Sequence, residues 1–133
     1  MPLVRIDLIE GMGDHRVAAI GSAVHEALVA TLGVPERDHF QIINEHARDR
    51  FIYDRSYLDI QRGDHPVFVQ VFLSARTTQE KQAFYAAVAK GLSEKAHVKP
   101  EDVAIVLTHN TREDWSFGNG EAQYVTRPKE LWK

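Results

Sequence analysis

The chain has 133 residues, of which 44% are hydrophobic and 26% charged, with a net charge of −3 and no cysteine. These values are typical of a single globular domain over residues 1–133, and they exclude a disulfide framework and the clustered basic charge that nucleic acid binding requires. No apolar run approaches the ~20 residues of a membrane span, and the start of the chain does not resemble a secretory signal, so we expect a cytoplasmic protein with neither nucleic acid nor membrane as a partner.

The first predicted element is a strand that directly follows a proline. Val4, Ile6 and Leu8 alternate with polar residues, which is the period of a half-buried strand. Pro2 stands just before them, where the missing N–H of an edge-strand proline costs nothing. If Met1 is removed, however, Pro2 exposes an amine at the edge of a folded core, and α-amino groups titrate near ~8. Pro2 is therefore either an ordinary strand-start residue or a reactive group.

A helix is predicted over residues 14–32, with Asp14 as its N-cap and Gly33 closing it. Its apolar stripe leaves His25 on the more exposed side. A second strand is predicted over residues 39–46. The connection between the two strands is long enough to require parallel pairing, so these elements form one β-α-β unit.

The second half of the chain shows the same order of elements after a charged segment. Thr77 and Glu80 form a capping box that opens its helix. The predicted elements are a surface loop or hairpin, a strand, a helix and another strand, over residues 47–64, 66–73, 78–96 and 103–108.

The two halves, about 1–64 and 65–133, repeat with a period near 65 residues. This repeat predicts an α+β fold in which two tandem β-α-β units form a four-stranded, mainly parallel sheet with two helices on one face. The other face would be bare, so we expect a cyclic oligomer that buries it. The aromatic tail, residues 110–133, is expected to pack against a neighbour or line a pocket.

Most common functional motifs are absent. The glycines in Gly11-Met12-Gly13 lack the third glycine of a dinucleotide fingerprint, because Arg16 stands in its place. The seven histidines show no metal-ligand spacing, and no serine lies in a nucleophile elbow. We therefore expect no metal, no cofactor and no serine hydrolase.

Several polar and aromatic groups lie at the predicted strand ends, where ligands bind in parallel β-α-β sheets. Pro2 opens the first strand, Asp38 precedes the second, Arg76 follows the third, and the segment 115–117 follows the fourth. Each also has an ordinary interpretation, as a strand start, a turn cap, a solvated charge or core packing. Together they predict a small carboxylate substrate. Arg76 would bind the carboxylate, the aromatic segment would exclude water, and the Pro2 nitrogen would exchange a proton or form an imine.

Five segments resemble the tautomerase superfamily and, within it, the malonate semialdehyde decarboxylase group. They are PLVRIDLIEG, GVPERDHFQI, EKQAFY, DWSFG and AQY, at residues 2–11, 33–42, 80–85, 114–118 and 122–124. The resemblance implies a homotrimer with amino-terminal proline catalysis and no cofactor. It also implies roles for individual residues: Pro2 as the catalytic proline, Asp38 as the aspartate of the decarboxylase group, Arg76 as a substrate-binding arginine, and Trp115 and Phe117 as pocket residues.

Ser74 departs from the decarboxylase pattern, which carries a second arginine there, so Ser74 joins Arg76 in the predicted substrate-binding set. The charge on Pro2 separates two reactions, because Asp38 favours the ammonium form and Arg76 opposes it. A cationic Pro2 predicts decarboxylation, with a hydratase side activity, of malonate semialdehyde or a related 3-oxo acid. A neutral Pro2 predicts a keto–enol tautomerase of a 2-keto acid such as phenylpyruvate. The sequence is also compatible with a non-catalytic trimeric scaffold or a ferredoxin-like regulatory dimer.

Overall fold

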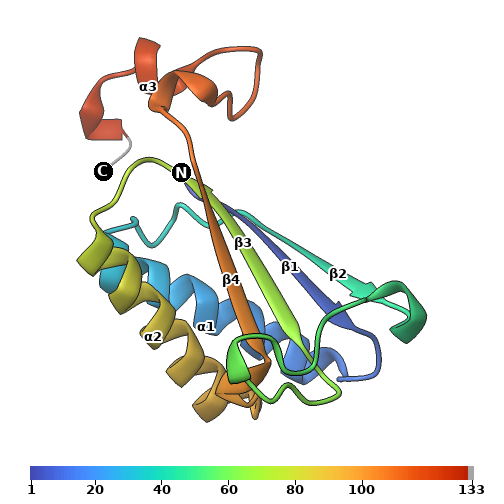
Figure 1. The fold of residues 1–133 in the computed structure, drawn as a ribbon. Helices are drawn as coiled ribbons and strands as arrows, with labels where there is room; N and C mark the ends of the chain where they lie inside the picture. The colour runs from blue at the N-terminus through green and yellow to red at the C-terminus, as the bar shows by residue number, and fades with distance from the viewer. Residues whose placement is uncertain (132–133) are drawn as a thin grey trace.

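The computed structural model describes residues 1–131 and contains a four-stranded sheet with two long helices on one face (Figure 1). The elements in chain order are β1 (Leu3–Ile9), α1 (Asp14–Leu32), β2 (Gln41–His46), β3 (Val67–Leu73), α2 (Thr78–Ala96), β4 (Val103–His109) and the short α3 (Gln123–Thr126). Within the described residues, no helix is both long enough and apolar enough to cross a membrane.

The sheet has the strand order β2-β1-β3-β4. β1 pairs with β2 in parallel, and β3 pairs with β4 in parallel, so both predicted β-α-β units are confirmed. The two units meet through β1 and β3, which are antiparallel, with Leu3 opposite Phe72. The sheet is thus parallel within each unit and antiparallel between them. β1 and β3 begin at Leu3 and Val67, which are 64 residues apart, close to the predicted period.

The core lies between the sheet and the two helices. Alternate residues of β1 point toward the helices, as predicted, and the inward face of α2 is fully buried. These residues are Val4, Ile6 and Leu8, at most 1% exposed, and Phe84, Val88 and Leu92, all 0% exposed. The period-two and helical patterns of the sequence therefore identify the buried faces correctly.

The opposite face of the sheet is only partly covered. Ile42 and Val106 lie on it, and their exposed fractions are 42% and 60%. Part of this face is covered by Phe51, whose ring packs edge-on against Phe68 with centroids 4.8 Å apart. Phe51 belongs to the charged segment 47–64, which forms a loop with two 3₁₀ turns and no strand. The prediction of a surface loop is confirmed there, and the prediction of a hairpin is wrong.

The start of α1 differs from the prediction. Asp14 is the first helical residue, and Gly13 is the N-cap, with φ 86° and no side-chain cap. The prediction of Asp14 as the N-cap is therefore wrong. The backbone at position 13 takes a conformation that glycine adopts without strain, and this moves the helix start by one residue. Asp14 instead places its negative charge in the first turn, where the helix dipole favours it.

His25 is buried, contrary to the prediction. Its exposed fraction is 8%, its Nε2 lies 2.8 Å from the carbonyl oxygen of Glu36, and its ring stacks on His39 at 3.9 Å. The cause is tertiary, because the turn that leads into β2 folds over this side of α1. A helical pattern alone does not report such a cover.

The predicted capping box of α2 is present. The Thr77 hydroxyl accepts a hydrogen bond from the Glu80 amide at 3.1 Å, and the Glu80 carboxylate accepts one from the Thr77 amide at 3.2 Å. We expect Thr77→Ala to lower the free energy of unfolding by about 1 kcal/mol, because the Glu80 amide at the helix start loses the hydroxyl that accepts its hydrogen bond. Urea denaturation measures this change. Thr77→Ser keeps the capping oxygen and is the control, and equal midpoints for the two variants would contradict the assignment.

Candidate active site

The predicted site groups meet at one edge of the sheet. Because β1 and β3 are antiparallel, the starts of β1 and β2 lie at the same edge as the ends of β3 and β4. Figure 1 shows the N-terminus and the tail with α3 at this edge, while the loop 47–64 lies at the other. Pro2, Asp38, Arg76 and the segment 115–117 flank these four strand ends.

The terminal amine lies in this region between an acid and a phenol. The chain in the structure begins with Met1, so its free amine belongs to Met1 and the Pro2 nitrogen is in a peptide bond. The Met1 amine donates hydrogen bonds to Asp38 Oδ2 and to the Tyr124 hydroxyl, the latter at 2.6 Å. Both Met1 and Pro2 are buried. The site thus already binds an amine one residue before Pro2.

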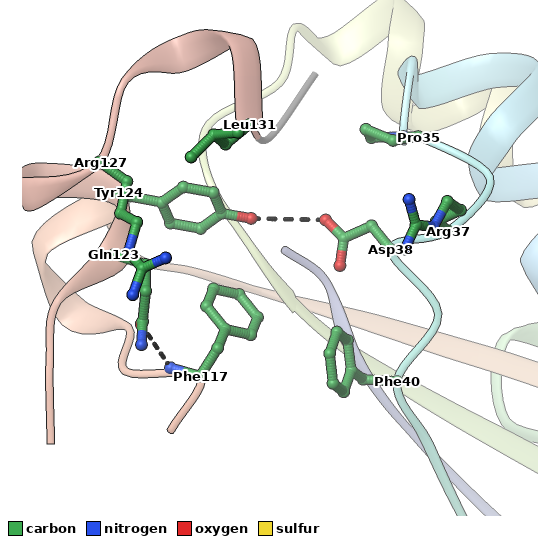
Figure 2. A pocket seen from close by; sticks show the side chains of 9 residues that line it. All are labelled: Pro35, Arg37, Asp38, Phe40, Phe117, Gln123, Tyr124, Arg127 and Leu131. Atoms are coloured by element: carbon green, nitrogen blue, oxygen red, sulfur yellow. Dashed lines mark hydrogen bonds between the residues drawn. The ribbon is translucent and has the colours of Figure 1, made fainter. Parts of the chain in front are cut away.

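Asp38 is held by the turn that precedes β2, where its amide donates to the carbonyl of Pro35 at 3.0 Å. Its side chain is 15% exposed. Oδ2 accepts from the Met1 amine and, at 3.4 Å, from the Tyr124 hydroxyl (Figure 2). Oδ1 is buried and has no hydrogen-bond partner among residues 1–131. A buried carboxylate oxygen of this kind is an acceptor for a ligand or a water molecule.

The surroundings shift the Met1 amine toward its uncharged form and keep the Tyr124 phenol protonated. Burial lowers the pKa of the Met1 amine below its ordinary value of 8.0, and Arg76 lowers it further, although the Asp38 carboxylate opposes both effects. Burial, together with the charge of Asp38, raises the pKa of Tyr124. The phenol therefore keeps its proton at neutral pH and can donate to Asp38.

Arg76 and Ser74 form one local unit at the end of β3. Arg76 Nη1 donates to the hydroxyl of Ser74 at 2.9 Å and to its carbonyl at 3.0 Å, while Nε donates to the carbonyl of Leu32 at 3.2 Å. Ser74 therefore orients the guanidinium group. Neither residue lines the cavity described next, so their predicted contact with substrate stays a prediction.

A cavity of about 380 Å³ opens beside Asp38 and Tyr124, as Figure 2 shows. Its lining combines aromatic rings with polar and charged groups. The lining residues are Pro35, Arg37, Asp38, Phe40, Phe117, Gln123, Tyr124, Arg127 and Leu131. Of the predicted site residues, Asp38 and Phe117 line this cavity. Its volume lies in the range of pockets that bind small molecules.

The tail builds one wall of the cavity from stacked rings. Trp115 stacks on Phe117 with centroids 5.5 Å apart, and Phe117 meets Tyr124 edge-on at 5.1 Å and Phe40 at 5.4 Å. The Trp115 indole N–H is anchored on Asn110 Oδ1 at 2.8 Å. Trp115 thus supports Phe117 from behind. The expectation that the tail lines a pocket is confirmed for its described part, and Trp132 lies outside the described residues.

Tyr124 is the functional candidate that the sequence did not single out. It lies 86 residues from Asp38 along the chain, so no local spacing links the two. The only signal is its place in the aromatic tail and in the AQY segment at residues 122–124. Residues 1–131 contain no group of three or more side chains arranged to hold a metal ion.

Comparison with known proteins identifies the family of these features. Two family models, both described as tautomerase enzyme, match residues 2–57 and 38–118. A probable tautomerase, YusQ of Bacillus subtilis (strain 168), is 36% identical over 126 residues, which are 94% of this chain and 99% of the relative.

Two solved structures share both fold and sequence. FG41 malonate semialdehyde decarboxylase, inhibited by 3-bromopropiolate, is 42% identical with a TM-score of 0.88, covering 93% of this chain and 95% of that one. A malonate semialdehyde decarboxylase, solved to explain its decarboxylase and hydratase activities, is 30% identical with a TM-score of 0.89, covering 93% and 96%.

Proposed function

The chain belongs to the tautomerase superfamily, in the group similar to malonate semialdehyde decarboxylase, and on this premise we propose that it acts through Pro2 on a small oxo acid without a cofactor. Membership makes the chain an enzyme of this superfamily. The reaction that we propose is decarboxylation of malonate semialdehyde or a related 3-oxo acid, with hydration as a side activity.

One observation carries the proposal: an amine is bound between Asp38 and Tyr124 at the start of β1. Removal of Met1 would convert the buried Pro2 nitrogen from an amide into an amine at the same edge of the sheet. It would also leave the Asp38 carboxylate and the Tyr124 hydroxyl facing that nitrogen. The charge of Arg76 lowers the pKa of the Met1 amine, which indicates that the guanidinium group lies near this amine. A substrate carboxylate between Arg76 and Pro2 would therefore meet two positive groups.

The proposed decarboxylation uses Pro2 as a cationic hydrogen-bond donor. The Pro2 ammonium polarises the 3-carbonyl oxygen while Arg76 orients the carboxylate. The bond between the carboxylate carbon C1 and C2 breaks, and C1 leaves as carbon dioxide. The electron pair of the broken bond stays on the remaining fragment and forms an enolate, which the Pro2 hydrogen bond stabilises. Protonation at C2 then gives the aldehyde. In the hydration reaction, Asp38 accepts a proton from the attacking water.

A second candidate is keto–enol tautomerisation of a 2-keto acid such as phenylpyruvate. Two observations favour it. Burial lowers the pKa of the Met1 amine despite Asp38, and the same burial around a freed Pro2 nitrogen would favour a neutral general base. The cavity also carries the rings of Phe40, Phe117 and Tyr124, which would pack against an aromatic substrate. In this reaction the neutral Pro2 nitrogen takes a proton from C3 and returns it to the oxygen.

The first prediction of the proposed function is that activity requires a free Pro2 amine. Protein that retains Met1, and processed Pro2→Ala protein, should both lose turnover, because one has an unreactive amide and the other lacks the secondary amine. Intact mass establishes the N-terminus, and NMR follows products from malonate semialdehyde, a haloacrylate-derived acid and phenylpyruvate.

The matched control for this experiment is Pro66→Ala. Pro66 directly precedes β3, as Pro2 precedes β1, but it lies at the other edge of the sheet. This variant should keep wild-type turnover. Equal activity of the wild-type protein with and without Met1 would refute the role of Pro2.

The second prediction concerns pH and separates the two candidate reactions. If Pro2 acts as a base, kcat/KM rises with pH through the amine pKa and then levels off, because only the neutral amine accepts a proton. If Pro2 acts as a cation, kcat/KM falls as pH rises through the same pKa. Burial lowers the pKa of the Met1 amine below 8.0, and because the Pro2 amine of processed protein would lie in the same buried region, we expect its limb to be displaced in the same direction. A profile that is flat between pH 5 and pH 9 would contradict both roles.

The third prediction is a homotrimer that buries the open face of the sheet. Exposed Ile42 and Val106, with the half-buried rings of Phe68 and Phe72, form a surface that a cyclic assembly would cover. Mass measurement in solution should give three copies of the 15.1 kDa chain. We expect Val106→Lys to weaken the assembly, whereas Tyr57→Lys, an equally exposed change in the loop 47–64, serves as the control. A monomer or dimer of the wild-type chain would refute the proposal.

A further inference from the structure

The Tyr124 hydroxyl bridges the two charged groups of the site. It accepts a hydrogen bond from the terminal amine at 2.6 Å and donates one to Asp38 Oδ2 at 3.4 Å. Figure 2 shows the phenol reaching across the cavity from the tail toward the carboxylate. The amine belongs to the first unit of the fold, whereas Tyr124 comes from α3 in the tail. The contact thus joins the tail to the catalytic edge of the sheet.

The ring that carries this hydroxyl is held in place by its neighbours. Phe117 packs edge-on against it at 5.1 Å. The adjacent Gln123 accepts from the amide of Phe117 at 2.8 Å and donates to the carbonyl of Gly118 at 2.7 Å. The Tyr124 side chain is partly buried. The contact between the Phe117 and Tyr124 rings does not involve the hydroxyl, so the hydroxyl can be removed while this packing stays.

The direction of the two hydrogen bonds limits the chemistry of the phenol. It is not a base for the substrate, because burial and Asp38 raise its pKa and it stays protonated. Its one proton is directed at Asp38, and its lone pairs face the ammonium group. It can therefore orient both groups, but it does not need to exchange a proton with either of them.

We propose that Tyr124 is a positioning residue of the active site, whose hydroxyl fixes the position of the Asp38 carboxylate relative to the amino-terminal ammonium. This inference rests on the proposed function, in which Pro2 supplies that ammonium after Met1 is removed. Tyr124 acts through Asp38 and Pro2, the two groups that its hydroxyl contacts. The expected consequence is an effect on kcat, because the geometry of the reacting groups changes while the apolar wall stays the same.

The test uses Tyr124→Phe, with Tyr57→Phe as the control. Tyr57 is 66% exposed in the loop 47–64, so it lies far from this edge of the sheet. In processed protein we expect Tyr124→Phe to lower kcat about tenfold or more with little change in KM, since a hydrogen bond to a charged group is lost. The Tyr57→Phe control should match wild type. Unchanged kcat in Tyr124→Phe would overturn the proposal.

A titration tests the same contact without relying on activity. In protein that retains Met1, labelled with ¹⁵N-methionine, NMR follows the amine as pH changes. Tyr124→Phe should lower the pKa of the Met1 amine by about one unit, because the ammonium form loses an acceptor. An unchanged amine pKa would overturn the proposal. If the titration shifts but the wild-type enzyme turns over no oxo acid, the proposed function fails while the contact stands.

A double variant separates positioning from a purely structural role. Because Tyr124 acts through Asp38, adding Tyr124→Phe to Asp38→Asn should change kcat much less than it changes the wild-type value. Independent, multiplicative effects would overturn the positioning role. Urea denaturation of each variant reports whether the tail still packs, and Tyr124→Leu, which also loses the ring, shows the size of a packing defect.

Discussion

The antiparallel pairing of β1 with β3 is the constraint on which the site depends. Each β-α-β unit is parallel, so each alone would leave the start of its first strand and the end of its last strand at opposite edges. Turning one unit relative to the other brings the start of β1 to the end of β3, with Leu3 opposite Phe72. Pro2 and Arg76 reach the same edge only for this reason. The repeat therefore creates a site that neither half contains by itself.

The chemistry at that edge follows from a balance between burial and charge. Burial disfavours an ammonium group, an adjacent carboxylate favours it, and a nearby guanidinium again disfavours it. For the terminal amine, burial has the largest effect. Asp38 therefore reduces the fall in pKa and does not reverse it. Arg76, which we propose binds a substrate anion, is oriented by Ser74, the residue that departs from the two-arginine pattern.

The tail turns this edge of the sheet into a cavity. Its contacting rings extend from Trp115 through Phe117 to Tyr124, and Phe40, just before β2, packs against Phe117. Ring contacts of this kind hold a segment in position without much regular secondary structure. The tail can therefore form a wall of the site although it contributes few residues to the core. The side chains of Asp38 and Met1 are only 15% and 8% exposed beside this wall, and low exposure to solvent strengthens the electrostatic interactions between the carboxylate and the amine. The tail, and not the sheet, would therefore limit the size of the substrate.

The sequence by itself determined the elements, their buried faces and the candidates Pro2, Asp38 and Phe117. These follow from alternation, helical spacing, capping and strand ends, which depend on neighbours along the chain. Where a neighbour came from elsewhere, the same reasoning was wrong, as for His25 beneath the turn before β2. Only the tertiary structure decided the antiparallel meeting of the units and the contact of Tyr124 with Asp38, 86 residues away. Long-range contacts depend on how complete elements pack, and no local period in a sequence records that packing.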